Sequence, residues 1–142
     1  MKKLIFLGMF LAFGAVAFSQ VVQVKEVPAV VVTTFQTSNP SVNAVVWKKS
    51  GTYYIADYNS DNNDMYVTYD PTGKVIESGQ AVDMSNVPAS VNTYVKTKYK
   101  DDKMVKYYKV VDAKGKTLWK GKVKSDYLLF DENGNYIKME KD

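Results

Sequence analysis

Two stretches of the chain, about 60 positions apart, carry apolar and polar residues in nearly the same order. Val27-Pro28-Ala29 recurs as Val87-Pro88-Ala89, and the segment 69–77 recurs as the segment 130–138. In 27–35 and 87–95, apolar residues fall four positions apart, which is the spacing of one face of a helix. A proline near a helix start costs no intrahelical hydrogen bond. The pattern predicts two internal repeats, each opening with a helix.

Short alternating runs, separated by turn residues such as Gly, Pro, Asn and Asp, follow each predicted helix. The predicted strands are 42–49, 52–59, 65–69 and 74–77, then 103–111, 116–123, 126–130 and 135–139. Short hairpins join antiparallel strands. The sequence therefore predicts an α+β fold. It has two tandem repeats of a helix plus four antiparallel strands, about 26–78 and 86–139, with the helices on one face of an antiparallel sheet and 78–86 as linker.

Alternation along the strands also predicts which side chains share a face of the sheet. The residues predicted to form one core with the helices are Val31, Phe35, Val67, Tyr69, Phe130 and Ile137, with Ile76 equivalent to Ile137. Two helices cover one face of such a layer. The other face is predicted to be open and to carry Tyr66, Tyr127 and Tyr136 beside lysines.

The first nineteen residues read as a secretory signal peptide. Lys2 and Lys3 precede an apolar stretch, and Ala17-Phe18-Ser19 has small residues where signal peptidase reads them. The stretch is too short for a membrane span of about 20 apolar residues. We predict cleavage before Gln20, a single domain over 20–142, and a periplasmic or secreted location without a membrane span after cleavage.

Composition narrows the chemistry that the chain can carry. The chain has no Cys and no His, so zinc sites, Cys nucleophiles and Ser-His triads are excluded, and no disulfides form. All its basic residues are Lys, and removing Lys2 and Lys3 lowers the formal net charge from +4 to +2. Because phosphate and base recognition favours Arg, we expect no nucleic-acid partner. We also expect no cofactor and no metal site.

Two groups of acidic residues have a functional interpretation besides that of ordinary turn residues. The segment 57–64 resembles the start of a calcium-binding loop, but Asn62 and Thr68 occupy the positions where such loops have Gly and Glu. A polar hairpin tip fits better and leaves weak calcium binding open. Asp70, Asp83 and Asp131 supply carboxylates for glycoside chemistry in principle. Turn carboxylates that bind their own backbone explain Asp70 and Asp131 more simply.

The whole pattern resembles a known family. Val-Pro-Ala-x-Val-x-x-x-Phe, a strand with Trp47, a Tyr-rich hairpin and Tyr/Phe-Asp-x-x-Gly-Lys are similar to the PepSY-like, β-lactamase-inhibitor-like family of exported bacterial proteins. The resemblance covers about residues 26–139. It implies a tandem repeat and a binding or inhibitory role without catalytic residues. Related secreted inhibitors contain disulfides, which this chain cannot form.

Three functions stay open at this point. The first, which we favour, is an exported non-enzymatic binding module, with protein inhibition as one candidate role. It docks a protein or peptide of the cell envelope through the open Tyr/Lys-rich face or the hairpin tips. The second is a small cell-envelope hydrolase, and the third is a structural or assembly component that pairs through sheet edges. We predict no catalytic residues, and binding by Tyr66, Tyr127 and Tyr136.

Overall fold

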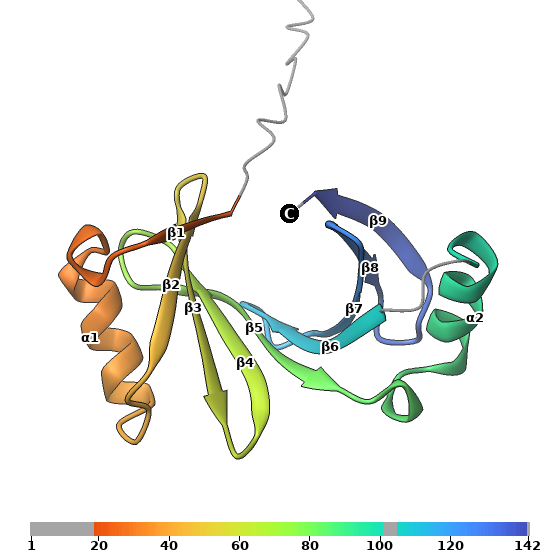
Figure 1. Cartoon of the computed structure of the whole chain (residues 1–142), viewed down its shortest axis with the longest axis horizontal. Helices are drawn as coiled ribbons and strands as arrows, with labels where there is room; N and C mark the ends of the chain where they lie inside the picture. The colour runs from red at the N-terminus through yellow and green to blue at the C-terminus, as the bar shows by residue number, and fades with distance from the viewer. Residues whose placement is uncertain (1–18, 101–104, 142) are drawn as a thin grey trace, which may run out of the picture.

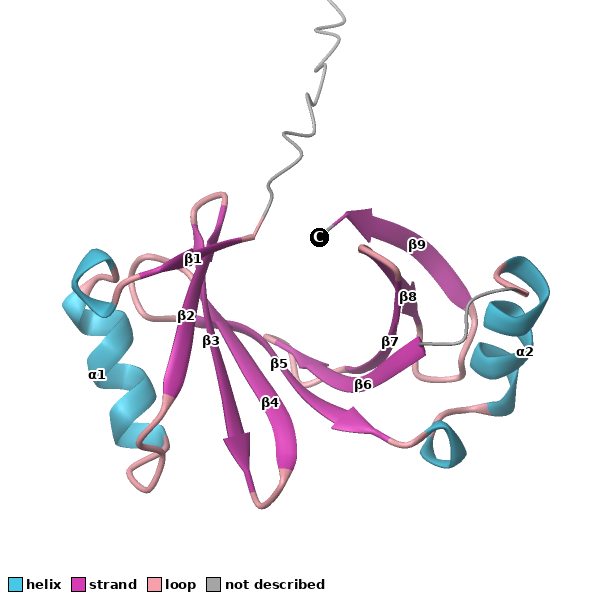
Figure 2. Ribbon diagram, in the orientation of Figure 1, coloured by secondary structure: helices cyan, strands magenta, loops and turns pink. Residues whose placement is uncertain are grey.

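The computed structural model describes residues 19–100 and 105–141, which form one antiparallel sheet of nine strands and two short helices (Figures 1 and 2). The strands lie in the sheet in the order of the chain. They are β1 (Gln20–Val22), β2 (Val45–Ser50), β3 (Tyr53–Ser60), β4 (Asn63–Tyr69), β5 (Val75–Val82), β6 (Val105–Asp112), β7 (Thr117–Val123), β8 (Asp126–Phe130) and β9 (Tyr136–Lys141). The helices are α1 (Ala29–Ser38) and α2 (Ala89–Lys98), each preceded by a 3-10 turn, η1 (Val24–Glu26) or η2 (Met84–Asn86).

The predicted fold class is wrong. The chain is mostly β, and its sheet is one continuous curl rather than a layer built from two helix-plus-four-strand repeats. The predicted linker 78–86 explains the error, because most of it is strand. β5 runs on to Val82, pairing with β4 over Val75–Gln80 and with β6 over Glu77–Val82. One strand therefore belongs to both halves and makes the sheet continuous.

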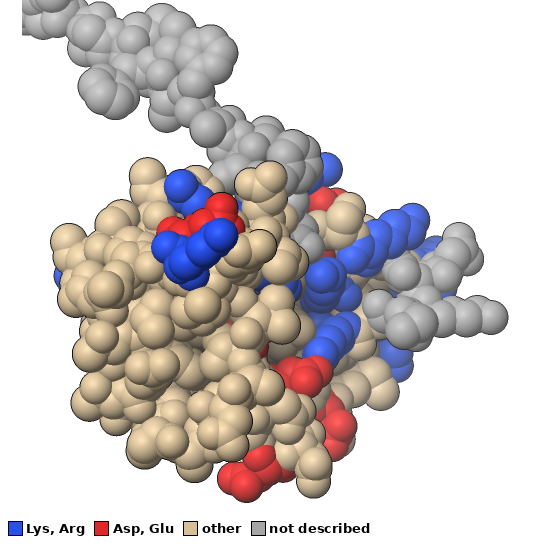
Figure 3. All heavy atoms as spheres, turned by 60° about the vertical axis from the view of Figure 1, so that its left-hand side comes forward, with Lys and Arg blue, Asp and Glu red and all other residues tan. Residues whose placement is uncertain are grey.

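The two helices lie outside the curl, at opposite ends of it (Figure 1). The segments 29–38 and 89–98 form helices as the apolar spacing predicts, and each begins directly after a proline. α1 has no charged residue. Figure 3 accordingly shows that side chains other than Lys, Asp and Glu cover most of the α1 side of the molecule. No helix in the described residues is long and apolar enough to cross a membrane.

The prediction of one shared core is also wrong, because each helix covers its own apolar cluster. The first cluster is Val27, Val31, Phe35, Trp47, Ala56, Val67 and Tyr69. The second is Val87, Val91, Val95, Tyr107, Val123, Leu128 and Phe130. The curved sheet separates the two helices, so Phe35 and Phe130 lie in different clusters. Ile137 belongs to neither and is 48% exposed.

Turns of the same type precede the strands β5, β7 and β9. Asp70, Asp112 and Asp131 each accept two backbone N–H bonds, from the residues two and four positions later, at 2.9–3.1 Å. These bonds favour the charged form, and the pKa values of Asp70 and Asp131 are lowered, chiefly by hydrogen bonds from Thr72 and Asn135 respectively. Each of these turns has a glycine with φ between +79° and +87°. Asp70 and Asp131 thus act as turn residues.

The predicted signal peptide 1–19 lies outside the described residues apart from Ser19. The candidate calcium loop 57–64 is the β3–β4 hairpin, whose tip residues Asp61 and Asn62 have positive φ, as a two-residue turn requires. The carboxylates at its two ends make ion pairs, Asp57 with Lys48 and Asp64 with Lys106.

Candidate functional site

The inner face of the curl holds a hollow of about 320 Å³ that the helices do not cover. Strand alternation directs every second side chain into it. Apolar and aromatic side chains form much of its wall, namely Tyr53, Ile55, Tyr66, Ile76 and Tyr127. Ile76 therefore lies on the inner face and not against a helix as predicted. A one-residue register shift between β4 and β5 falls beside it and explains the change of face.

A buried lysine lies at the centre of this face. Lys120, on β7, is 8% exposed, and its Nζ lies 2.7 Å from Glu77 Oε1 on β5 and 3.3 Å from Glu140 Oε2 on β9. Burial alone lowers the pKa of Lys120, but attraction by Glu77 and Glu140 outweighs burial and raises it. Lys120 therefore keeps its charge and ties three strands together across the curl.

Tyr66 is held in place beside this lysine. Its hydroxyl donates to Glu77 Oε1 at 3.1 Å, and its ring lies over Gly79 of β5. A Cβ at position 79 would lie 2.1 Å from a ring atom of Tyr66, so any larger residue there would displace the ring. Burial first, then Glu77, raises the pKa of Tyr66. Tyr66 is therefore a fixed, neutral part of the wall.

Tyr127 and Tyr108 extend this aromatic surface across the second half of the sheet. The Tyr108 ring centre lies 5.8 Å from that of Tyr66, edge to face. The ammonium groups of Lys120 and Lys122 lie 6.0 and 5.1 Å from the ring centre of Tyr127. Cations at this distance are attracted to an aromatic ring. The inner face thus combines rings that are already ordered with lysines lying over them.

The structure brings together two of the three predicted binding residues. Tyr66 and Tyr127 both line the hollow. Tyr136 instead lies on the outer face, where its ring stacks on Tyr94 of α2 with centres 4.6 Å apart and contacts Phe130 edge to face. A register shift between β8 and β9 accompanies this change. The predicted placement of Tyr136 is therefore wrong.

Sequence reasoning missed the charged residues at the centre of the hollow. A signal was present for Lys120, because along the predicted strand 116–123 it alternates with Trp119, Gly121 and Val123 and so had to face the opposite side. Glu77 and Glu140 gave no such signal. Their role depends on the curl, which brings β5 and β9 within reach of β7.

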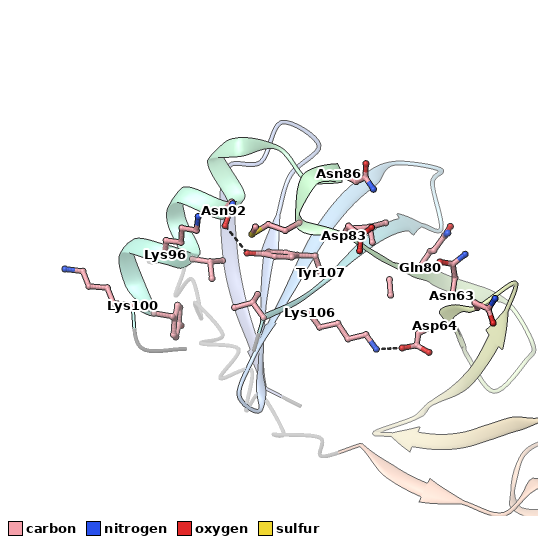
Figure 4. Close-up of a pocket in the computed structure, with 17 residues that line it drawn as sticks. Asn63, Asp64, Gln80, Asp83, Asn86, Asn92, Lys96, Lys100, Lys106 and Tyr107 are labelled. Carbon is pink, nitrogen blue, oxygen red and sulfur yellow. Dashed lines mark hydrogen bonds and ion pairs between the residues drawn. The ribbon is translucent and has the colours of Figure 1, made fainter. Parts of the chain in front are cut away.

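A second hollow, of about 870 Å³, lies between the β3–β4 hairpin tip, η2 and α2 (Figure 4). Amide side chains such as Asn63, Gln80 and Asn86 line it, together with the Asp64–Lys106 ion pair. The Tyr107 ring closes one side, and its hydroxyl donates to Asn92 Oδ1 at 3.5 Å. Its wall lacks the cluster of aromatic rings and isoleucines found inside the curl. Within residues 19–100 and 105–141, no three acidic side chains gather as a metal site would require.

Comparison with known proteins shows which solved structures have a similar fold. No family model matches the chain, and no curated protein matches it. A solved BLIP-like protein from Bacteroides fragilis is 18% identical, with a TM-score of 0.52, over 79% of this chain and 84% of its own. The fold resembles that of a BLIP-like protein. This likeness supports the β-lactamase-inhibitor-like part of the resemblance seen in the sequence, at the level of the fold.

Two further structures are more similar in shape. A protein from Bacteroides eggerthii described as periplasmic has a TM-score of 0.65 at 18% identity, over 81% of this chain and 88% of its own. A DUF2874 family protein from Bacteroides uniformis has a TM-score of 0.63 at 21% identity, over 80% and 88%. The first of these agrees with the periplasmic or secreted location predicted from the N-terminal pattern.

Proposed function

We propose that this chain is an exported, non-enzymatic binding module that docks a protein or peptide of the cell envelope inside its curled sheet and thereby inhibits it. The observation that carries the proposal is the aromatic hollow on the one sheet face that the helices leave uncovered. Concave sites lined by apolar and aromatic side chains with a few polar groups are typical of binding sites. The BLIP-like neighbour supports a role in binding protein.

The wall of the hollow is suited to binding because it is already ordered. Tyr66 is fixed by its hydrogen bond to Glu77 and by the space over Gly79. Aromatic groups that do not lose freedom on binding contribute their contact area at a low entropic cost. A volume of about 320 Å³ accommodates one or two side chains. We therefore expect the partner to anchor itself through an apolar or aromatic residue inserted between Tyr53 and Tyr127.

The chemistry of the same face favours binding over catalysis. A catalytic lysine acts as a nucleophile only after losing its proton, which requires a lowered pKa. The pKa of Lys120 is raised, because Glu77 and Glu140 hold its charge. Its charge therefore serves to order the wall. A partner with an acidic or hydroxyl group near its anchor would add a contact to this charge.

The test begins with capture of partners from periplasmic extract on the immobilised chain 20–142, followed by titration of the purified partner and assay of the partner's own activity. Tyr127→Ala removes a ring from the hollow and should weaken binding about tenfold or more, as loss of a central aromatic anchor does. Tyr136→Ala is the matched control, since it removes a tyrosine from the outer face. It should leave the affinity within about twofold, by the same reasoning for residues outside a contact.

Two results would contradict the proposal. A folded Tyr127→Ala variant that binds with unchanged affinity would move the site away from the hollow. A partner that binds the wild-type chain but keeps its full activity would remove the inhibitory role. Tyr66→Phe distinguishes the hydroxyl from the ring, because it keeps the packing over Gly79 and removes only the bond to Glu77.

A further inference from the structure

The last strand of the sheet has an edge without a neighbouring strand among the described residues. β9 pairs with β8 alone, whereas β5, in the middle of the sheet, pairs with β4 on one side and β6 on the other. Three large side chains on β9 are exposed to a similar extent: Tyr136 at 41%, Ile137 at 48% and Met139 at 44%. An edge strand of this length with exposed apolar residues is a template for further pairing.

β5 begins in the same way as β9, and it shows how the edge of such a strand is paired. Each strand follows a turn in which an Asp side chain binds the backbone, and each has a one-residue register shift next to its second residue. β5 then takes up β6 as an antiparallel neighbour, starting from Glu77. The corresponding part of β9 begins at Lys138. The edge from Lys138 to Lys141 therefore has the local form of an edge that is paired elsewhere in the molecule.

We propose that β9 pairs with β9 of a second copy of this chain, in an antiparallel arrangement around a twofold axis at Met139. A twofold axis between antiparallel strands runs perpendicular to the sheet, so residues on the same face lie opposite one another. Only certain registers satisfy this condition. Centring on Lys138 sets lysine against lysine, and centring on Glu140 sets glutamate against glutamate.

Centring on Met139 removes both conflicts. Lys138 then lies opposite Glu140 of the second copy, and the same pair forms again across the axis. Met139 faces its own counterpart, and Ile137 lies opposite the aliphatic stem of Lys141. Opposite charges directly across an antiparallel pair stabilise it, and like charges oppose it. The sequence Ile-Lys-Met-Glu-Lys of β9 is thus self-complementary in one register.

Charges on an edge strand usually serve to prevent pairing. A protective edge works best with charges of one sign, since these repel in every register. β9 carries both signs, two positions apart on the inner face, where Lys138 and Glu140 already attract at 3.4 Å. Five residues from each chain cover less surface than a permanent dimer requires. We therefore expect a reversible dimer that forms with rising concentration and extends the sheet to two joined curls.

The register can be tested with single cysteines, because the chain has none of its own. In Met139→Cys the two thiols lie directly across the axis, with Cα atoms about 4.5–5.5 Å apart, within the range of a disulfide. Ile137→Cys is the matched control, since Ile137 is exposed to a similar extent on the same strand. Its two copies would lie about 13 Å apart, four residues of rise, and too far to bridge. We expect mild oxidation of the chain 20–142 to link the first variant and not the second.

A charge reversal gives an independent measurement. Lys138→Glu places glutamate against glutamate twice, so the dissociation constant of the dimer, measured by sedimentation velocity, should rise about tenfold or more. Lys25→Glu makes the same change of charge on the exposed η1 turn and should leave it unchanged. The proposal is overturned if the wild-type chain stays monomeric at all concentrations. It is also overturned if both cysteine variants link equally, or if Lys138→Glu dimerises as the wild type does.

Discussion

Replacing the buried lysine of the inner face gives the sharpest test of how the site is held together. In Lys120→Met the side-chain volume is nearly kept, but Glu77 and Glu140 lose the cation that lies between them. Breaking a buried ion pair by removing one partner costs about 3–5 kcal/mol. Glu77 and Glu140 are 22% and 36% exposed, so water relieves part of the cost. We expect a loss of about 3 kcal/mol, the low end of that range.

A loss of this size is easy to measure. A domain of this length unfolds with a free energy of roughly 5–15 kcal/mol. With a urea dependence of about 1.5 kcal/mol per molar, the unfolding midpoint should fall by about 2 M. Trp47 packs in the first apolar cluster and Trp119 against the second, so their fluorescence reports on both halves of the sheet. Coincident transitions would show that the two halves unfold together.

Two further variants separate the effect of the lost Lys120 charge from the other effects of the Lys120→Met substitution. Lys109→Met, on the neighbouring strand β6, changes an exposed lysine and should stay within about 0.5 kcal/mol of wild type. Adding Glu77→Gln and Glu140→Gln to Lys120→Met removes the stranded carboxylates and should restore much of the stability. If Lys120→Met costs no more than Lys109→Met, or if the added changes destabilise further, the buried charge does not hold the inner face as we infer.

The remaining predictions concern the core, alkaline pH and processing. Phe35→Ala, at a site 1% exposed and edge to face with Trp47, should cost about 3–5 kcal/mol, while Val30→Ala on the exposed side of α1 should stay within about 0.5 kcal/mol. Burial raises the pKa of Tyr69 to about 12. The neutral Tyr69 side chain therefore contributes fully to stability below pH 10, and this contribution falls as the pH rises toward 12. Thermal unfolding measured at pH 9 to 12 should show this decline, and a flat profile would contradict it. N-terminal sequencing of the exported chain should begin at Gln20, whereas an intact Met1 would refute signal cleavage.

The sequence allowed good prediction of local structure. The helices after Pro28 and Pro88, and turns such as Asp70–Gly73, depend on residues close in the chain, and these agree with the structure. The fold class could not be predicted in this way. It depends on whether 78–82 is a linker or a strand, and the Ser-Gly-Gln sequence there has low strand propensity. Only pairing with both β4 and β6 makes it a strand.

The site was predicted in part for a similar reason. Alternation along regular strands places Tyr66 and Tyr127 correctly, but it fails where the register shifts by one residue, as it does beside Ile76 and Ile137. A shift of one position moves a side chain to the other face. The contacts of Lys120 with Glu77 and Glu140 are long-range. They arise from the curl of the sheet, which no local pattern encodes.

The order of the strands has a consequence for how the chain reaches this structure. Because strand order follows chain order from β1 to β9, every strand pairs with one that is adjacent along the chain. Six of the eight pairings close short hairpin loops, whereas β1–β2 and β5–β6 each enclose a helix. Short loop closure is associated with fast folding. With no cysteine, no oxidation step has to precede the final structure. A chain that emerges from a membrane N-terminus first can therefore add each hairpin to the sheet as it arrives, without waiting for its C-terminal end.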